Sequence, residues 1–118
     1  MSQPITQVEV EAEIIRLSDL LETSTHELAE ASYEHAVAEA TYRAEYAKVF
    51  VDADGAMPYR QETARLACAP AYLTRRVSEA RQMGLQEAGR NLRARLDALR
   101  SINTNLRGTI GNATGVGR

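Results

Sequence analysis

The fold is decided by the stretch VDADGAMPYR (residues 51–60), which separates two long segments with apolar residues at helical spacing. Asp54 and Gly55 form a pair typical of a turn. Pro58 ends one helix just before the next begins, because proline cannot continue a preceding helix. The sequence therefore predicts a helical hairpin that reverses direction at this stretch.

Before the turn, the sequence predicts two helices, at about residues 5–21 and 25–51. Glu22 to Thr25 indicate a break, and Ser24 and Glu27 match a capping box, which indicates that the second helix starts just after Ser24. In the first helix the apolar stripe consists of Val8, Ala12, Ile15 and Leu20. In the second, a heptad-like seam with spacings of 4, 3, 4, 3 and 4 consists of Tyr33, Val37, Ala40, Ala44, Ala47 and Val51. The alanines of such a seam let a neighbouring helix approach closely.

After the turn, a third helix is predicted at about residues 59–106, and Pro70 is expected to kink or restart it. Its seam consists of Leu66, Ala69, Leu73, Val77, Ala80 and Gly84, followed by Leu85, Ala88, Leu92, Leu96, Leu99 and Leu106. Gly108 is expected to cap this helix, and residues 108–118 are expected to form a flexible, glycine-rich tail.

These elements predict an all-α fold, namely a long helical hairpin with an additional N-terminal helix, in a single helical domain of residues 1–107. A slender helical protein buries little apolar surface per residue, and oligomerisation is the usual remedy. We therefore expect a homo-oligomer.

Charge is divided unevenly along the 118 residues, whose net charge is −2. Residues 1–54 carry twelve acidic and three basic side chains, a balance of −9, whereas residues 55–118 carry four acidic side chains and eleven arginines, a balance of +7. Such asymmetry favours either a polyanionic partner or halves that pack together. No apolar run approaches the roughly 20 residues that span a bilayer, and the start does not match a signal peptide, so we expect a cytoplasmic protein.

The sequence offers little for catalysis. His26 and His35 have no cysteine or carboxylate at ligand spacing, and Cys68 has no histidine near it in sequence. Neither a glycine-rich phosphate loop nor a G-x-S-x-G motif is present. We expect neither an enzyme nor a bound metal or cofactor.

Two groups of side chains suggest binding. Tyr42 and Tyr46 share one helical face with Arg43 and Lys48 nearby, and aromatic rings interleaved with cations suit single-stranded nucleic acid, although such tyrosines also pack between helices. A second group, spaced by seven residues beside the leucine seam, consists of Arg93, Arg100 and Arg107. These arginines can pair with carboxylates of the acidic half or hold phosphates.

The order of three motifs, YRAEYAKVFVDADG (42–55), YRQETARL (59–66) and LDALRS (96–101), resembles the recombination mediator proteins of tailed phages, the UvsY type, and their short phage relatives. The resemblance covers about residues 25–106. Its matching positions are Tyr42, Arg43, Tyr46, Lys48, Asp54, Gly55, Arg60, Glu62, Leu96, Asp97, Ala98, Leu99, Arg100 and Ser101. The chain differs from the family pattern by carrying Glu45 between the two cations.

The resemblance implies a ring-like homo-oligomer in the host-cell cytoplasm that binds single-stranded DNA during phage recombination or replication. It also implies that the protein helps load a RecA-like recombinase onto strands covered by single-strand-binding protein. By position, the resemblance points to Arg43 and Lys48 as DNA contacts. Together with Tyr42, Tyr46 and Arg60, they are the nucleic-acid-binding residues that we predict. We assign Arg93, Arg100 and Arg107 mainly to subunit contacts, with DNA as a secondary contact. The alternative is a phage structural or assembly protein, such as a scaffold, chaperone or coiled-coil adaptor, that acts by self-association only.

Overall fold

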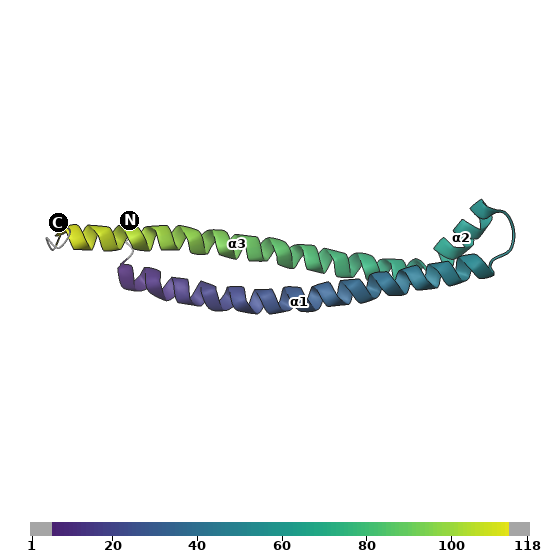
Figure 1. The fold of residues 1–118 in the computed structure, drawn as a ribbon, viewed down its shortest axis with the longest axis horizontal. Coiled ribbons are helices and arrows are strands. Elements are labelled where there is room, and N and C mark those ends of the chain that lie inside the picture. The colour runs from purple at the N-terminus through teal and green to yellow at the C-terminus, as the bar shows by residue number, and fades with distance from the viewer. Residues whose placement is uncertain (1–5, 114–118) are drawn as a thin grey trace, which may run out of the picture. The chain divides into compact units, whose positions relative to one another are not determined.

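The computed structural model describes residues 6–113, with side chains described to residue 109, and this part of the chain is almost entirely helical. It comprises α1 (Gln7–Asp52), α2 (Met57–Ala67) and α3 (Ala69–Ala113), with no strand among the described residues (Figure 1). The predicted all-α fold is confirmed.

The turn lies where the sequence predicts it. Helix α1 ends at Asp52, and Gly55 has a φ of 103°, in the left-handed region that glycine adopts without steric cost. Pro58 lies in the first turn of α2, where the missing N–H needs no partner. The chain therefore reverses between α1 and α2, as expected for a hairpin.

The predicted break near residues 22–25 is wrong, because α1 is one continuous helix. The hydroxyl of Thr25 donates to the Leu21 carbonyl (2.8 Å), a bond that accommodates threonine inside a helix. The capping box lies instead at the start of α1. There the Glu9 N–H donates to Thr6 Oγ1 (3.2 Å), and the Thr6 N–H donates to Glu9 Oε2 (3.3 Å). No additional N-terminal helix exists in the described residues.

The third predicted helix is divided at Cys68, which lies between α2 and α3 with φ −99° and ψ 11°. Pro70 is the second residue of α3, so it restarts the helix without kinking it. The expected cap at Gly108 is also wrong, because α3 continues to Ala113. One glycine costs a helix only about 1 kcal/mol, which a long helix tolerates. The remaining tail residues, 114–118, lie outside the described residues.

The chain divides into two compact units. The single domain of residues 1–107 stays a prediction. Unit 1 comprises Met1–His26 and Glu87–Arg118, and unit 2 comprises Glu27–Gln86. Within the described residues, unit 1 pairs the first part of α1 with the last part of α3. Unit 2 contains the turn, all of α2 and the adjoining parts of α1 and α3.

The core of unit 1 is a leucine-rich seam. Val10, Leu17 and Leu96 are at most 2% exposed. Half-buried neighbours at spacings of three and four are Ile14, Leu21, Leu92, Leu99 and Leu106. The second part of the predicted α3 seam, from Leu85 to Leu106, is therefore confirmed, apart from the exposed Ala88. The predicted α1 stripe is wrong, because Val8, Ile15 and Leu20 are exposed. The apolar residues of α1 that are buried or half-buried in unit 1 are instead Val10, Ile14, Leu17 and Leu21.

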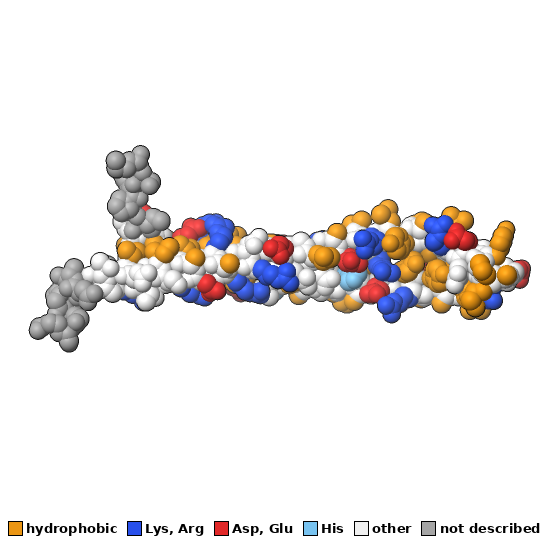
Figure 2. Space-filling model, turned by 90° about the horizontal axis from the view of Figure 1, so that it is seen from above, with side chains coloured by type: hydrophobic (Ala, Val, Ile, Leu, Met, Phe, Trp, Pro, Cys, Tyr) orange, Lys and Arg blue, Asp and Glu red, His pale blue; other side chains and the backbone are white. Residues whose placement is uncertain are grey.

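The fully buried side chains of unit 2 are small, and several of the half-buried ones are polar. The buried residues are Ala31, Ala64 and Cys68. The half-buried residues between α1 and α3 include His35, Ala38, Tyr42, Arg75, Ser78 and Gln82. The seam predicted for this region is wrong, since most of its large members are exposed, including Tyr33, Val37, Val51, Leu66, Leu73 and Val77. Figure 2 shows hydrophobic side chains on the molecular surface over the part of the chain that carries α2.

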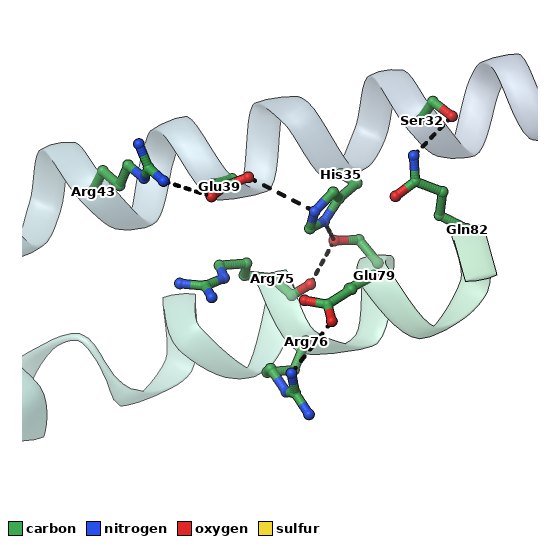
Figure 3. Close-up of polar contacts among 9 residues, drawn as sticks. Ser32, His35, Glu39, Arg43, Arg75, Arg76, Glu79 and Gln82 are labelled. Carbon is green, nitrogen blue, oxygen red and sulfur yellow. Dashed lines mark hydrogen bonds and ion pairs between the residues drawn. The ribbon is translucent and has the colours of Figure 1, made fainter.

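A polar layer joins α1 to α3 within unit 2 (Figure 3). Gln82 Nε2 donates to Ser32 Oγ (3.0 Å), and His35 Nδ1 lies 3.1 Å from Ser78 Oγ. Because the Ser78 hydroxyl donates to the Arg75 carbonyl (2.8 Å), His35 Nδ1 is the donor in its contact with Ser78. These bonds fix which residues of the two helices lie level with each other.

Candidate nucleic-acid interface

Three aromatic rings form a ladder along α1. Tyr42, Tyr46 and Phe50 recur every four residues, so they lie on one face of the helix. The ring centroids of Tyr42 and Tyr46 are 6.0 Å apart, and those of Tyr46 and Phe50 are 6.3 Å apart with an interplanar angle of 12°. The structure thus brings together the two tyrosines that the sequence singled out and adds a phenylalanine.

Helix α3 adds a fourth ring and a cation. The ring of Tyr72 meets that of Tyr42 edge-on at 5.7 Å. The Arg75 guanidinium lies 5.2 Å from the Tyr42 ring centroid and 5.7 Å from that of Tyr72, within the range of a cation–π interaction. Its buried Nε has no hydrogen-bond partner among the described residues. The aromatic ladder is therefore interleaved with positive charge.

A cavity of about 340 Å³ opens beside these rings and is lined by Tyr42, Arg65, Ala69 and Tyr72. Arg65 is exposed and pairs with Glu62 (2.6 Å). The hydrogen bond and the charge of Arg65 lower the pKa of Glu62 below its ordinary value, and the same pair raises the pKa of Arg65. Two rings and a guanidinium around one opening provide both a surface on which a base can stack and hydrogen-bond donors for a phosphate.

Arg60 is held by the turn. Its guanidinium donates to the Phe50 carbonyl (3.1 and 2.9 Å) and to the Val51 carbonyl (3.5 Å), and lies 4.6 Å from the Phe50 ring centroid. These carbonyls belong to the last turn of α1, which has no further helical N–H to bond. Arg60 therefore stabilises the end of α1, and most of its donors are already engaged.

Arg43 and Lys48 lie on the exposed surface of α1. The Arg43 side chain is 75% exposed and pairs with Glu39 (2.9 Å). Lys48 has no ion-pair partner in residues 6–109 and lines a groove of about 410 Å³ together with Glu45 and Asp52. Both cations are accessible to a ligand.

Sequence reasoning missed four members of this cluster, namely Phe50, Arg65, Tyr72 and Arg75. The four-residue spacing of Tyr42 and Tyr46 continues to Phe50 and could have identified it. Arg65, Tyr72 and Arg75 follow the turn, so only the folded hairpin places them beside α1. We call these seven residues together (Tyr42, Tyr46, Phe50, Arg60, Arg65, Tyr72 and Arg75) the aromatic–cation cluster.

The arginines spaced by seven residues, Arg93, Arg100 and Arg107, lie in unit 1, where all three are exposed. Arg107 donates to Glu11 (3.2 Å), Arg100 lies 3.9 Å from Asp97, and Arg93 has no ion pair among the described side chains. The nearby Glu13 has its pKa lowered by a hydrogen bond from Arg16 and by the charges of Arg16 and Arg95. Part of the positive charge of α3 is therefore matched by carboxylates of the same chain.

Within residues 6–113, no cluster of three or more side chains is suited to hold a metal ion. No helix of that part of the chain combines the length and apolar character needed to cross a membrane. Comparison with protein-family models, with curated proteins and with solved structures gives no match for this chain.

Proposed function

We propose that this chain is a non-catalytic single-stranded DNA-binding protein that acts as a phage recombination mediator. In this role it helps load a RecA-like recombinase onto strands covered by single-strand-binding protein. The observation that supports the proposal is the aromatic–cation cluster of unit 2. There the ring of Tyr42 contacts those of Tyr46 and Tyr72, with the Arg75 guanidinium over two of the three rings.

The cluster suits single strands because their bases are free to stack. A base entering the cavity beside Tyr42 and Tyr72 would stack on an aromatic ring, while Arg65 meets a phosphate. Such stacking contributes about 1–3 kcal/mol per base. Arg43 and Lys48, both exposed on α1, would hold the adjoining backbone. One chain offers few such contacts, so repetition in a homo-oligomer would raise the overall affinity.

The proposal is tested by fluorescence anisotropy with a labelled oligothymidine at increasing salt. We expect binding that weakens steeply as salt rises, because phosphate contacts release counterions. A variant with Arg43→Ala and Lys48→Ala is expected to bind at least about tenfold more weakly at low salt, as two phosphate contacts are lost. The matched control replaces Arg76 and Arg90 with alanine. It removes the same amount of positive charge, but from two exposed arginines of α3 and not from α1. Equal binding by the two double variants would refute the assignment of Arg43 and Lys48.

Stacking is tested separately with Tyr72→Leu, which keeps an apolar side chain on α3. We expect weaker binding of the oligonucleotide with little change in the salt slope, because the variant loses a ring and no charge. Unchanged affinity would show that the rings only pack the helices together.

A second candidate is a phage assembly protein that acts by self-association only. It is favoured by the exposed apolar side chains of unit 2 and by pairs such as Arg107 with Glu11, in which the chain matches its own charges. Self-association without oligonucleotide binding at low salt would support this candidate against the first.

A further inference from the structure

One face of unit 2 carries an apolar groove between α1 and α3. Two hollows of about 500 Å³ each share Glu34, Ala38 and Thr74 in their linings, so they form one continuous groove. Small side chains that line it are Ala38, Thr41, Ala71 and Thr74, and large ones are Tyr33 and Val37 from α1 and Leu73 and Val77 from α3. The four large side chains are between 47% and 72% exposed. Nothing in the described part of the chain covers them.

We propose that a second copy of this chain packs its own unit 2 against this groove, which forms a four-helix bundle with a two-fold axis along the helices. The proposal does not depend on DNA binding. The large side chains of the groove belong to heptad-spaced stripes that lie outside the contact between α1 and α3. A helix with such a stripe packs against another helix with the same repeat. This chain has one stripe on α1 and another on α3.

Charge complementarity selects the second copy and its orientation. Residues 27–54 carry seven acidic and two basic side chains, a balance of −5, and residues 57–86 carry five arginines and two glutamates, a balance of +3. A two-fold axis along the helices places α1 of one copy antiparallel to α3 of the other. Each acidic helix then has a basic neighbour on both sides, as already occurs within one copy where Arg81 pairs with Glu34 (2.8 Å). A two-fold axis across the helices would instead place the two acidic segments together.

The same symmetry places the largest side chain of the groove, Tyr33, beside small residues. Within one copy, Ser32 lies level with Gln82 and His35 with Ser78. A two-fold axis along the helices preserves these levels, so Tyr33 of one copy would lie beside Ala80 and Gly84 of the other. A Cβ built at Gly84 meets nothing within 4 Å, which leaves open space for the incoming ring.

The experiment is to measure mass in solution by light scattering at micromolar concentrations. We expect the wild-type chain to form a dimer or a higher even-numbered assembly. Gly84→Leu is expected to shift the mass to the monomer, because the added side chain occupies the space of the partner's tyrosine. Leucine favours helix over glycine by up to about 1 kcal/mol, so the variant is expected to keep its helical circular dichroism.

The matched control is Gly108→Leu, which makes the same change on α3 in unit 1, where a Cβ likewise meets nothing within 4 Å. This control is expected to assemble like the wild type. A second variant, Val77→Glu, places a charge in the groove and is also expected to give a helical monomer. A monomeric wild type, an odd-numbered assembly, or wild-type mass for both Gly84→Leu and Val77→Glu would each overturn the proposal.

Discussion

Units 1 and 2 contain parts of the same two long helices, yet they distribute their apolar side chains differently. In unit 1 the fully buried side chains include Leu17 and Leu96, whereas the buried side chains of unit 2 are Ala31, Ala64 and Cys68. Among the described side chains, ten large hydrophobic residues of unit 2 are exposed, against four in unit 1. Unit 1 therefore uses its large apolar side chains to join α1 to α3, and unit 2 leaves most of its own on the surface.

The difference shows that heptad spacing identifies a packing face without identifying its partner. In unit 2 the contact between α1 and α3 contains His35, Ser78 and Gln82, which hydrogen-bond across the helices. Polar groups at such positions specify register at some cost in stability. We infer that unit 1 supplies most of the intramolecular stability and that unit 2 is better suited to contacts with other molecules.

The largest effect is expected for Leu96→Ala, in unit 1. This side chain is 2% exposed, and its truncation should lower the free energy of unfolding by about 2–5 kcal/mol, because a cavity is added to the lost burial. Thermal unfolding followed by circular dichroism measures it. The control is Ile15→Ala, whose side chain is 64% exposed and which should have little effect. Equal losses in the two variants would contradict the assignment of the leucine seam.

A smaller loss is expected for Arg60→Ala, in unit 2. The variant leaves the Phe50 carbonyl without its two N–H donors and removes the cation over the Phe50 ring, which should cost about 1.5–3 kcal/mol. Hydrogen exchange should accelerate in the last turn of α1. Arg65→Ala is the control, since it removes an exposed arginine of α2 paired only with Glu62. A stable Arg60→Ala variant that loses oligonucleotide binding would instead assign Arg60 to DNA.

Ser78→Ala tests the polar layer of unit 2. His35 Nδ1 would lose its acceptor across the helices, and because His35 is half-buried the cost should be about 1 kcal/mol. Urea denaturation gives the change in free energy, and the exposed Ser101→Ala is the control. A stabilised Ser78→Ala variant would mean that the polar layer adds nothing to the contact between α1 and α3.

The smallest effect is expected from pH. Interaction with Arg16 and Arg95 lowers the pKa of Glu13 in unit 1 below its ordinary value of 4.5. A lowered pKa in the folded state contributes stability that is present above about pH 4.5 and is lost as the pH falls below it. Glu13→Gln should therefore flatten the acid limb of a plot of melting temperature against pH. Glu22→Gln, at an exposed position without an ion pair among the described side chains, should leave the limb unchanged.

Much of the fold could be predicted because its signals are local. Gly55 and Pro58 mark the turn through their own backbone preferences, and Leu92, Leu96, Leu99 and Leu106 mark a stripe that is buried or half-buried. The break expected at Ser24 failed because the same residues that cap a helix are tolerated inside one when tertiary contacts continue it. The residue types and spacing of a capping box are also present at Thr6 and Glu9, where α1 begins.

The candidate site was only partly accessible to sequence reasoning. Tyr42 and Tyr46 are near neighbours on one helix, so their proximity follows from helical geometry alone. Tyr72 and Arg75 join them across the hairpin, and the level at which α3 meets α1 determines that contact. The sequence alone suggests that Arg60 is free to bind a ligand. The structure shows instead that its guanidinium lies over the Phe50 ring and donates to the Phe50 carbonyl at the end of α1.

The amino-acid sequence by itself determined that the chain is helical, that it reverses at residues 52–58, and that acidic and basic segments lie on opposite sides of that turn. These features depend on backbone preference and composition, which act within a few residues. Only the tertiary structure decided which of several heptad-spaced stripes is buried. In unit 2 it buried Ala31 and exposed Val37, because two helices can share only one contact face and the register of their polar bonds selects it.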